Sequence, residues 1–321
     1  MSEANFDTII VGAGISGLSA AAVLLQEPGH TVLILEKQLA AGGRLKTDTE
    51  TFTGPDGQPF AIDLGGNWFH GGVQNNKNPL VALADEADLP YVFTDWENES
   101  TFDNGKKLST SETDSAWELY YEILEECSKF VAKSDVSKDQ SMSETLAAFY
   151  ADYEPSTAEK HTFEQLLASD VIMGESAAPS ALSSSTLLGD GAYLTGGDFL
   201  VRDFNKIPRM LADRMPANTV LYNITVAEID TSAEAGDATV TTSDGTTYKA
   251  KHVICTLPVG VLKRSPPPVS FVPALPDDVT QALSELAIGI YQKHFLQFPS
   301  VFWDETKHVF FNVPPSPGPY K

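Results

Sequence analysis

The sequence is poor in cysteine and in positive charge, and each shortage excludes a class of protein. Its 321 residues include two cysteines, Cys127 and Cys255, which lack CxxC spacing. They cannot build a disulfide framework, and they do not suit a structural zinc site. Lysine and arginine number 21 against 44 aspartates and glutamates, so the formal net charge is −23. Because a nucleic-acid-binding surface must neutralise phosphates, we do not expect nucleic acid as a direct partner.

Long apolar runs are also absent. No run reaches the roughly 18 apolar residues that a membrane-spanning helix needs. The nearest stretch, residues 9–25, is interrupted by glycines. The first residues carry acids instead of the basic region of a signal peptide. We therefore expect no membrane partner and a cytoplasmic location.

The negative charge is unevenly distributed along a chain of about two domains' length. Roughly half of the excess lies between residues 85 and 154. Such a segment is typical of a solvated surface, and it also suits an electrostatic field that attracts cationic substrates. We favour the solvated surface and keep the electrostatic field as the alternative.

A complete βαβ unit opens the chain. Residues 6–11 and 31–35 are rich in Ile, Val and Leu and predict two buried parallel strands, and an Ala- and Leu-rich helix ends near residue 26. The loop between the first strand and the helix reads Gly12-Ala13-Gly14-Ile15-Ser16-Gly17. The second strand ends at Glu36. This arrangement is the dinucleotide-binding fingerprint in its full structural context.

Each glycine of the loop, and Glu36, is of a residue type that dinucleotide binding requires at its position. Gly12 permits the tight turn, Gly14 lets the backbone approach a pyrophosphate, and Gly17 allows close packing of helix on sheet. The helix N-terminus offers N–H groups and a positive dipole end to phosphates. The carboxylate of Glu36 can accept hydrogen bonds from ribose hydroxyls.

A Gly42-Gly43-Arg44 turn follows and favours FAD over NAD. An arginine at this place can reach the pyrophosphate or the flavin side of a dinucleotide. The alternative is that Arg44 forms an ion pair on the surface.

The rest of the chain alternates between helical and strand patterns. The acidic residues 96–192 are mostly helical in pattern and predict an inserted domain. Strand patterns return between residues 219 and 257, and residues 277–286 predict a helix. Residues 291–298 predict a further strand.

Several motifs together resemble those of the flavin-containing amine oxidases, which include monoamine oxidases, polyamine oxidases and lysine-specific histone demethylases. The motifs are residues 11–18, Glu36, residues 42–44, 63–71, 194–197, 253–263 and 288–296, and Phe302-Trp303. They cover nearly the whole chain, and the Trp68-Phe69-His70-Gly71 stretch is most similar to polyamine oxidases.

The resemblance implies an α/β fold with a Rossmann-type FAD-binding domain and an interleaved α+β substrate domain. We expect residues 1–95 and 195–265 to form the first domain, and residues 96–194 and 266–321 to form the second. The cofactor implied is FAD. Its expected binding residues are Gly12, Ala13, Gly14, Ser16, Gly17, Glu36, Gly43, Arg44, Gly65, Gly66, Asn67, Trp68 and Val226.

Within that set, the resemblance implies that residues 65–68 pass beside the flavin and that Val226 lies near the adenine. It also implies two catalytic residues. Lys293 matches a lysine that holds a water close to the flavin, and His70 matches a position that faces the substrate amine. From the residues alone, Lys293 could instead be an exposed edge lysine, and His70 a structural histidine. No metal site is expected.

The reaction implied is oxidation of an amine, most similar to polyamine oxidation, by hydride transfer to the flavin. Hydrolysis of the imine follows, and oxygen is the electron acceptor that yields hydrogen peroxide. The alternatives are a catalytically inactive FAD-binding remnant and an L-amino-acid oxidase on the same fold. We expect a histone demethylase less, because the central block shows no long helical tower.

The family continues well beyond the Phe302-Trp303 motif, with segments that complete both domains. The sequence is therefore interpreted as C-terminally truncated relative to the family. We expect a fragment, a truncated relative, or one half of a two-chain enzyme whose second chain supplies the rest.

Overall fold

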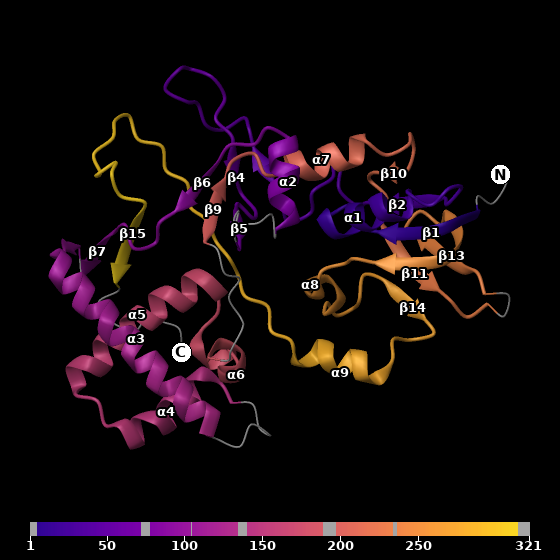
Figure 1. Ribbon diagram of the computed structural model, residues 1–321. Helices are drawn as coiled ribbons and strands as arrows, with labels where there is room; N and C mark the ends of the chain where they lie inside the picture. Colours follow the sequence, from indigo (N-terminus) through magenta and orange to yellow (C-terminus); the bar gives the residue numbers. More distant parts are fainter. Residues whose placement is uncertain are drawn as a thin grey trace. The chain divides into compact units, whose positions relative to one another are not determined.

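The computed structural model describes residues 5–71, 78–103, 105–133, 140–188, 197–233 and 236–313. The chain forms two compact units with interleaved segments (Figure 1). Unit 1 comprises Met1–Val92 and Phe199–Leu286, and unit 2 comprises Phe93–Asp198 and Ala287–Lys321. The first two boundaries lie within a few residues of those expected. Residues 266–286 group with unit 1, although the sequence analysis placed them in the second domain.

A seven-stranded sheet forms the centre of unit 1, in the order β10-β2-β1-β13-β12-β11-β14. The strands are β1 (Asn5–Val11), β2 (Val32–Leu35), β10 (Val220–Leu221), β11 (Val226–Asp230), β12 (Ala238–Thr242), β13 (Thr247–Cys255) and β14 (Ser270–Val272). β10, β2, β1 and β13 are parallel neighbours, whereas β12 runs antiparallel to both β13 and β11. β14 pairs in parallel with β11, which explains why residues after 265 belong to this unit.

Apolar residues cover both faces of this sheet. Helix α1 (Ile15–Leu24) packs Leu18 and Ala21 against Ile10 and Ile34 on one face. The alternate residues of the same strands, among them Ile9 and Leu33, form a second cluster on the other face. Because both faces are buried, β1 and β2 read as continuous apolar runs, as the sequence indicated.

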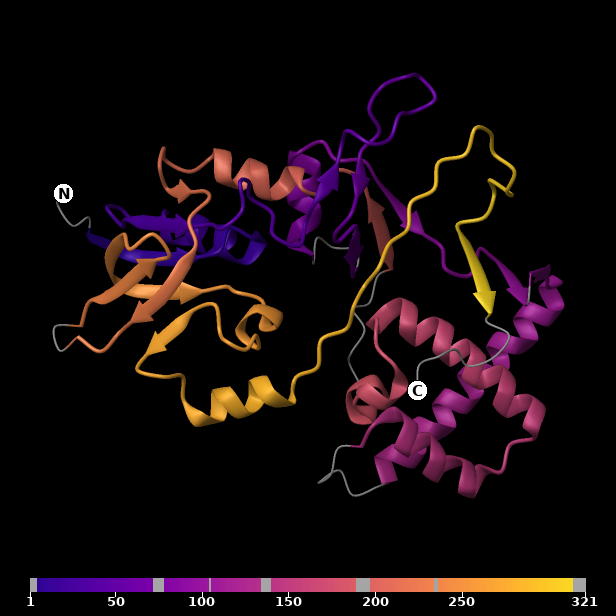
Figure 2. The ribbon, with the colours of Figure 1, turned by 180° about the vertical axis from the view of Figure 1, so that it is seen from behind.

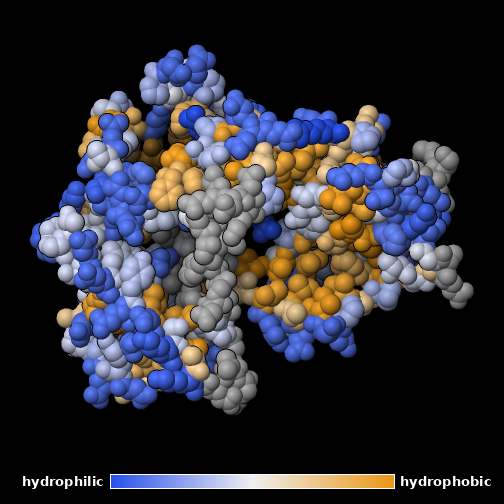
Figure 3. All heavy atoms as spheres, in the orientation of Figure 1, coloured by the Kyte–Doolittle hydropathy of each residue, from blue (hydrophilic) through white to orange (hydrophobic). Residues whose placement is uncertain are grey.

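Shorter elements complete unit 1. They are β3 (Thr47–Asp48), β4 (Ile62–Asp63), β5 (Trp68–His70), α2 (Pro79–Glu86), β6 (Tyr91–Thr94), β9 (Asp198–Val201), α7 (Lys206–Asp213), α8 (Val259–Leu262) and α9 (Asp277–Glu285). β3 and β4 form an antiparallel hairpin, and β5, β9 and β6 form a small sheet. The unit boundaries fall within β6 and at the start of β9. Figure 3 shows hydrophobic residues on the surface of unit 1 around α8.

Unit 2 is mainly helical, with a three-stranded sheet in the order β15-β7-β8 (Figures 1 and 2). Its elements are β7 (Glu99–Asp103), β8 (Lys106–Lys107), α3 (Thr110–Lys133), α4 (Met142–Tyr153), α5 (Thr157–Glu175), η2 (Pro179–Ala181), α6 (Ser184–Leu188) and β15 (Val309–Val313). The core joins α3, α4 and α5 through Tyr120, Phe149 and Phe163. The Tyr120 and Phe163 rings stack at 5.4 Å.

The strand predicted over residues 291–298 is wrong. Residues 286–308 contain neither a helix nor a strand, although Ile290 and Leu296 belong to a strand-like alternation. Their side chains are 78% and 76% exposed. An alternating pattern becomes a strand only when a neighbouring strand supplies the ladder of hydrogen bonds, and none in the described part of the chain pairs with this segment.

None of the helices in the described ranges is long and apolar enough to cross a membrane.

Candidate dinucleotide-binding site

In the glycine loop between β1 and α1, neighbouring atoms leave no room for a side chain at Gly12 or Gly17, whereas Gly14 has open space beside it. Gly12 has φ of +107°, and a Cβ there would lie 2.8 Å from Thr256 Oγ1. A Cβ at Gly17 would overlap the Gly12 carbonyl. Gly14 differs, because its φ is −75° and a Cβ there would meet no atom within 4 Å. The space above Gly14 is thus open to a ligand, as a pyrophosphate cradle requires.

Glu36 holds this loop to the end of β2. Its side chain is 7% exposed, and Oε2 accepts a hydrogen bond from the Ala13 backbone N–H at 2.6 Å. Oε1 accepts from the Gln38 N–H at 2.7 Å. A carboxylate oxygen can accept more than one hydrogen bond, so Glu36 retains acceptor capacity for a ribose hydroxyl.

The Gly42-Gly43-Arg44 turn lies against the loop. The Gly42 N–H donates to the Ala13 carbonyl at 3.0 Å, and Gly14 and Gly42 form a parallel bridge. Arg44 is exposed, and no ion pair of its side chain occurs within the described ranges. Among the residues that the structure describes, the surface ion pair weighed from the sequence is not observed, so the exposed guanidinium faces solvent, where an anionic ligand could reach it.

The next predicted segment, residues 65–68, continues the same surface. The Gly66 N–H donates to the Arg44 carbonyl at 3.2 Å, and a Cβ at Gly65 would overlap that carbonyl. The Asn67 carbonyl accepts from Val201 N–H at 2.8 Å, which ties the segment to β9. Trp68 begins β5. The loop, Glu36, the glycine turn and residues 65–68 are thus linked in one continuous series of hydrogen bonds, through the Glu36 side chain and otherwise through the backbone.

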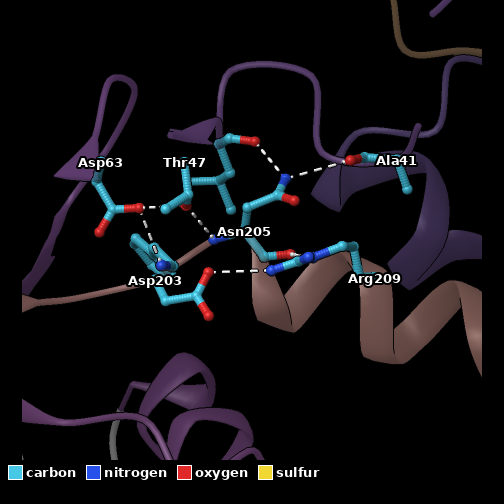
Figure 4. Close-up of polar contacts among 8 residues, drawn as sticks. Ala41, Thr47, Asp63, Asp203, Asn205 and Arg209 are labelled. Carbon is cyan, nitrogen blue, oxygen red and sulfur yellow. Dashed lines mark hydrogen bonds and ion pairs between the residues drawn. The ribbon is translucent and has the colours of Figure 1, made fainter. Parts of the chain in front are cut away.

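A partly buried polar network, centred on Asp63 and Asn205, ties the glycine turn and β4 to the residues before α7 (Figure 4). Asn205 Nδ2 donates to the carbonyls of Ala41 and Leu45 at 3.2 and 2.5 Å, and so brackets the glycine turn. Asp63 Oδ1 accepts from Thr47 Oγ1 at 2.5 Å and from the Phe204 N–H at 3.0 Å. Burial is the main influence on Asp63 and raises the pKa of its carboxyl. The sequence analysis assigned no role to these supporting residues.

The other predicted residues are more dispersed. Ser16 is exposed in the first turn of α1. Val226 is buried at the start of β11, two residues after Ile224, whose N–H donates to the Glu36 carbonyl at 2.9 Å. His70 ends β5 in unit 1 and is exposed, and its carbonyl accepts from Asn78 Nδ2 at 3.0 Å.

Lys293 belongs to unit 2, and its Nζ lies 5.9 Å from the centre of the Tyr291 ring. Within the motif at residues 194–197, residues 194–196 lie outside the described residues. Nowhere in the described ranges do three His, Cys, Asp or Glu side chains converge as metal ligands.

Comparison with known proteins identifies the class. The profile of the family described as "Flavin containing amine oxidoreductase" matches residues 15–319. The chain therefore belongs to this family, as its motifs predicted, and the cofactor is FAD. The open space over Gly14 and the exposed guanidinium of Arg44 fit this dinucleotide.

The chain is also similar to individual curated proteins. The chain is 30% identical to "Lysine-specific histone demethylase 1 homolog 2" of Oryza sativa subsp. japonica, covering 94% of this chain and 38% of that protein. It is 29% identical to "Polyamine oxidase 4" of the same organism, covering 96% and 62%. The chain thus spans between about two fifths and three fifths of the length of these relatives.

A solved structure of a redesigned putrescine oxidase matches with a TM-score of 0.59 at 20% identity. The match covers 87% of this chain and 63% of that one. It confirms the predicted α/β FAD-binding fold.

Proposed function

We propose that this chain takes part in FAD-dependent oxidation of a small polyamine. The observation that carries the proposal is the cradle of unit 1, by which we mean residues 12–17, Glu36, residues 42–44 and residues 65–68. In this cradle, Gly14 leaves space for a pyrophosphate, and the exposed guanidinium of Arg44 is available to an anion. The relatives named polyamine oxidase support the choice of substrate. The net charge of −23 agrees with it, because a negative field concentrates cationic amines.

The two units have different roles in the proposed reaction. Unit 1 binds the cofactor through residues 12–17, Glu36, residues 42–44 and residues 65–68. Unit 2 contributes to the substrate side. When bound, FAD supplies the acceptor for the hydride that leaves the carbon next to the amine nitrogen. Oxygen is the final electron acceptor.

The chain's own residues prepare the amine. The nitrogen must arrive unprotonated, since a protonated nitrogen has no lone pair to support loss of hydride. His70, at the end of β5, is the proposed acceptor of that proton. Lys293 is the proposed holder of a water through its ammonium N–H donors.

The test combines two measurements on the 321-residue chain. Calorimetric titration gives the affinity for FAD, and a coupled assay measures hydrogen peroxide formed with spermine or spermidine. A dimethyl-lysine peptide and L-lysine are assayed separately as alternative substrates. Peroxide release with a polyamine supports the proposal. FAD binding without turnover of any amine would favour an inactive FAD-binding remnant, and turnover of L-lysine alone would favour an amino-acid oxidase.

A further inference from the structure

The hydroxyl of Thr256 contacts the start of the glycine loop. Thr256 follows β13, whose last residue, Cys255, is in register with Val11 of β1. Thr256 Oγ1 donates to the Val11 carbonyl at 2.8 Å, and the Thr256 N–H donates to the same oxygen at 3.1 Å. Oγ1 also lies 3.4 Å from the Gly12 carbonyl oxygen. One side chain thus faces two consecutive carbonyl groups where the chain turns out of the sheet.

The same hydroxyl occupies the space that the glycine at position 12 leaves open. A Cβ on Gly12 would lie 2.8 Å from Thr256 Oγ1, closer than real Cβ atoms approach. On the other side, the Gly12 carbonyl packs against Gly17, where a Cβ would overlap it. The Gly12 peptide is therefore enclosed between the end of β13 and helix α1, and a Cβ at either Gly12 or Gly17 would force it to move.

The loop is held from three directions as a result. Thr256, the residue after β13, donates to the Val11 carbonyl, and Glu36, the residue after β2, accepts from the Ala13 N–H. The Gly42 N–H holds the Ala13 carbonyl from the turn that follows β2. The direction of the N–H groups at the start of α1 depends on how these peptide groups are oriented, and phosphate binding at a helix N-terminus depends on that direction.

We propose that Thr256 is a positioning residue for the pyrophosphate of the cofactor. Its hydroxyl sets the orientation of the Val11 and Gly12 carbonyls. The orientation of these peptide groups in turn determines the direction in which the loop and the first N–H groups of α1 face the phosphates. The inference rests on the proposed FAD site of unit 1. A side chain of equal size without a donor would leave the two carbonyls facing a methyl group.

The experiment compares three variants of the full chain. Thr256→Val removes the hydroxyl and keeps the shape, whereas Thr256→Ser keeps the hydroxyl. Thr231→Val is the matched control, because Thr231 Oγ1 also donates to a backbone carbonyl of the same sheet, that of Val272 at 3.3 Å. We expect Thr256→Val to weaken FAD binding by roughly two- to tenfold, the range of one neutral hydrogen bond, and Thr256→Ser and Thr231→Val to bind as the wild type does.

Competition by ADP and AMP separates positioning from general damage. ADP carries a pyrophosphate and AMP does not, so Thr256→Val should reduce the preference for ADP over AMP. An equal loss for both nucleotides, or wild-type FAD affinity in Thr256→Val, would overturn the inference. A wild-type chain with no affinity for FAD would instead refute the proposed function. Thermal unfolding of each variant identifies any that has not folded.

Discussion

The Ala13 backbone N–H and the buried carboxylate of Glu36 are joined by a hydrogen bond of 2.6 Å. The residue expected to recognise the ribose therefore also fixes the loop expected to bind the pyrophosphate. A substitution of Glu36 is therefore expected to affect both the position of the loop and the proposed recognition of the ribose.

Replacement of Glu36 by alanine should weaken FAD binding at least tenfold. Each hydrogen bond to a charged group contributes about 1.5–3 kcal/mol, and the variant loses the bonds to the Ala13 and Gln38 N–H groups as well as those to the ribose. Glu36→Gln keeps one acceptor oxygen and should lie between the alanine variant and the wild type. Calorimetric titration with FAD measures both. Wild-type affinity in Glu36→Ala would contradict the assignment.

Asp63 should make the stability of the chain depend on pH. Burial raises its pKa above the ordinary 3.8 of an unfolded aspartate. The protonated form is thus favoured by folding, and its contribution is fully present below the unfolded pKa. That contribution is lost as the pH rises through the raised, folded-state pKa.

Asparagine and alanine at position 63 separate charge from hydrogen bonding. Asp63→Asn keeps an acceptor for the Phe204 N–H and Thr47 hydroxyl, and its free energy of unfolding relative to wild type should increase as the pH rises from 3 to 7. Asp63→Ala leaves those donors unpaired and should cost about 1–3 kcal/mol. Urea unfolding at several pH values measures both. A difference between Asp63→Asn and wild type that stays constant with pH would disprove the charge effect.

Local patterns were sufficient to predict the glycine loop between β1 and α1, and distant contacts were not visible in them. The βαβ unit depends on residues within about 30 positions, which the order of Gly12, Gly14, Gly17 and Glu36 specifies. Asn205 and Thr256 act across 160 and 245 positions, through hydrogen bonds to Leu45 and Val11. A single sequence gives no sign of such pairs. The pairing of β14 with β11, which extends unit 1 past residue 265, is missed for the same reason.

Lys293→Met should slow amine oxidation without weakening FAD binding. Lys293 lies in unit 2, whereas the cradle is built from unit 1. Loss of its ammonium removes the proposed hydrogen-bond donors to water and leaves the loop contacts intact. Stopped-flow absorbance at about 450 nm follows reduction and reoxidation of the flavin, a signal supplied by the cofactor itself. Lys133→Met, at the end of α3, is the control. Equal turnover in both variants would make Lys293 a structural residue only.

The exposed apolar side chains of residues 286–303 should promote association between molecules. Ile290, Leu296 and Phe302 are 78%, 76% and 72% exposed, and no strand in the described part of the chain covers them. A β-prone apolar segment without a partner strand pairs readily with another chain. The double substitution Ile290→Lys and Leu296→Lys should therefore lower self-association, measured by light scattering across a concentration series.

The cradle of unit 1 provides an internal check on that substitution. Because both positions lie in unit 2, the lysines should leave the affinity for FAD unchanged. Val23→Lys is the matched control, since Val23 is 65% exposed but stands alone on α1 and should not drive association. If the double variant associates as strongly as the wild type, or if Val23→Lys has the same effect, another surface must be responsible.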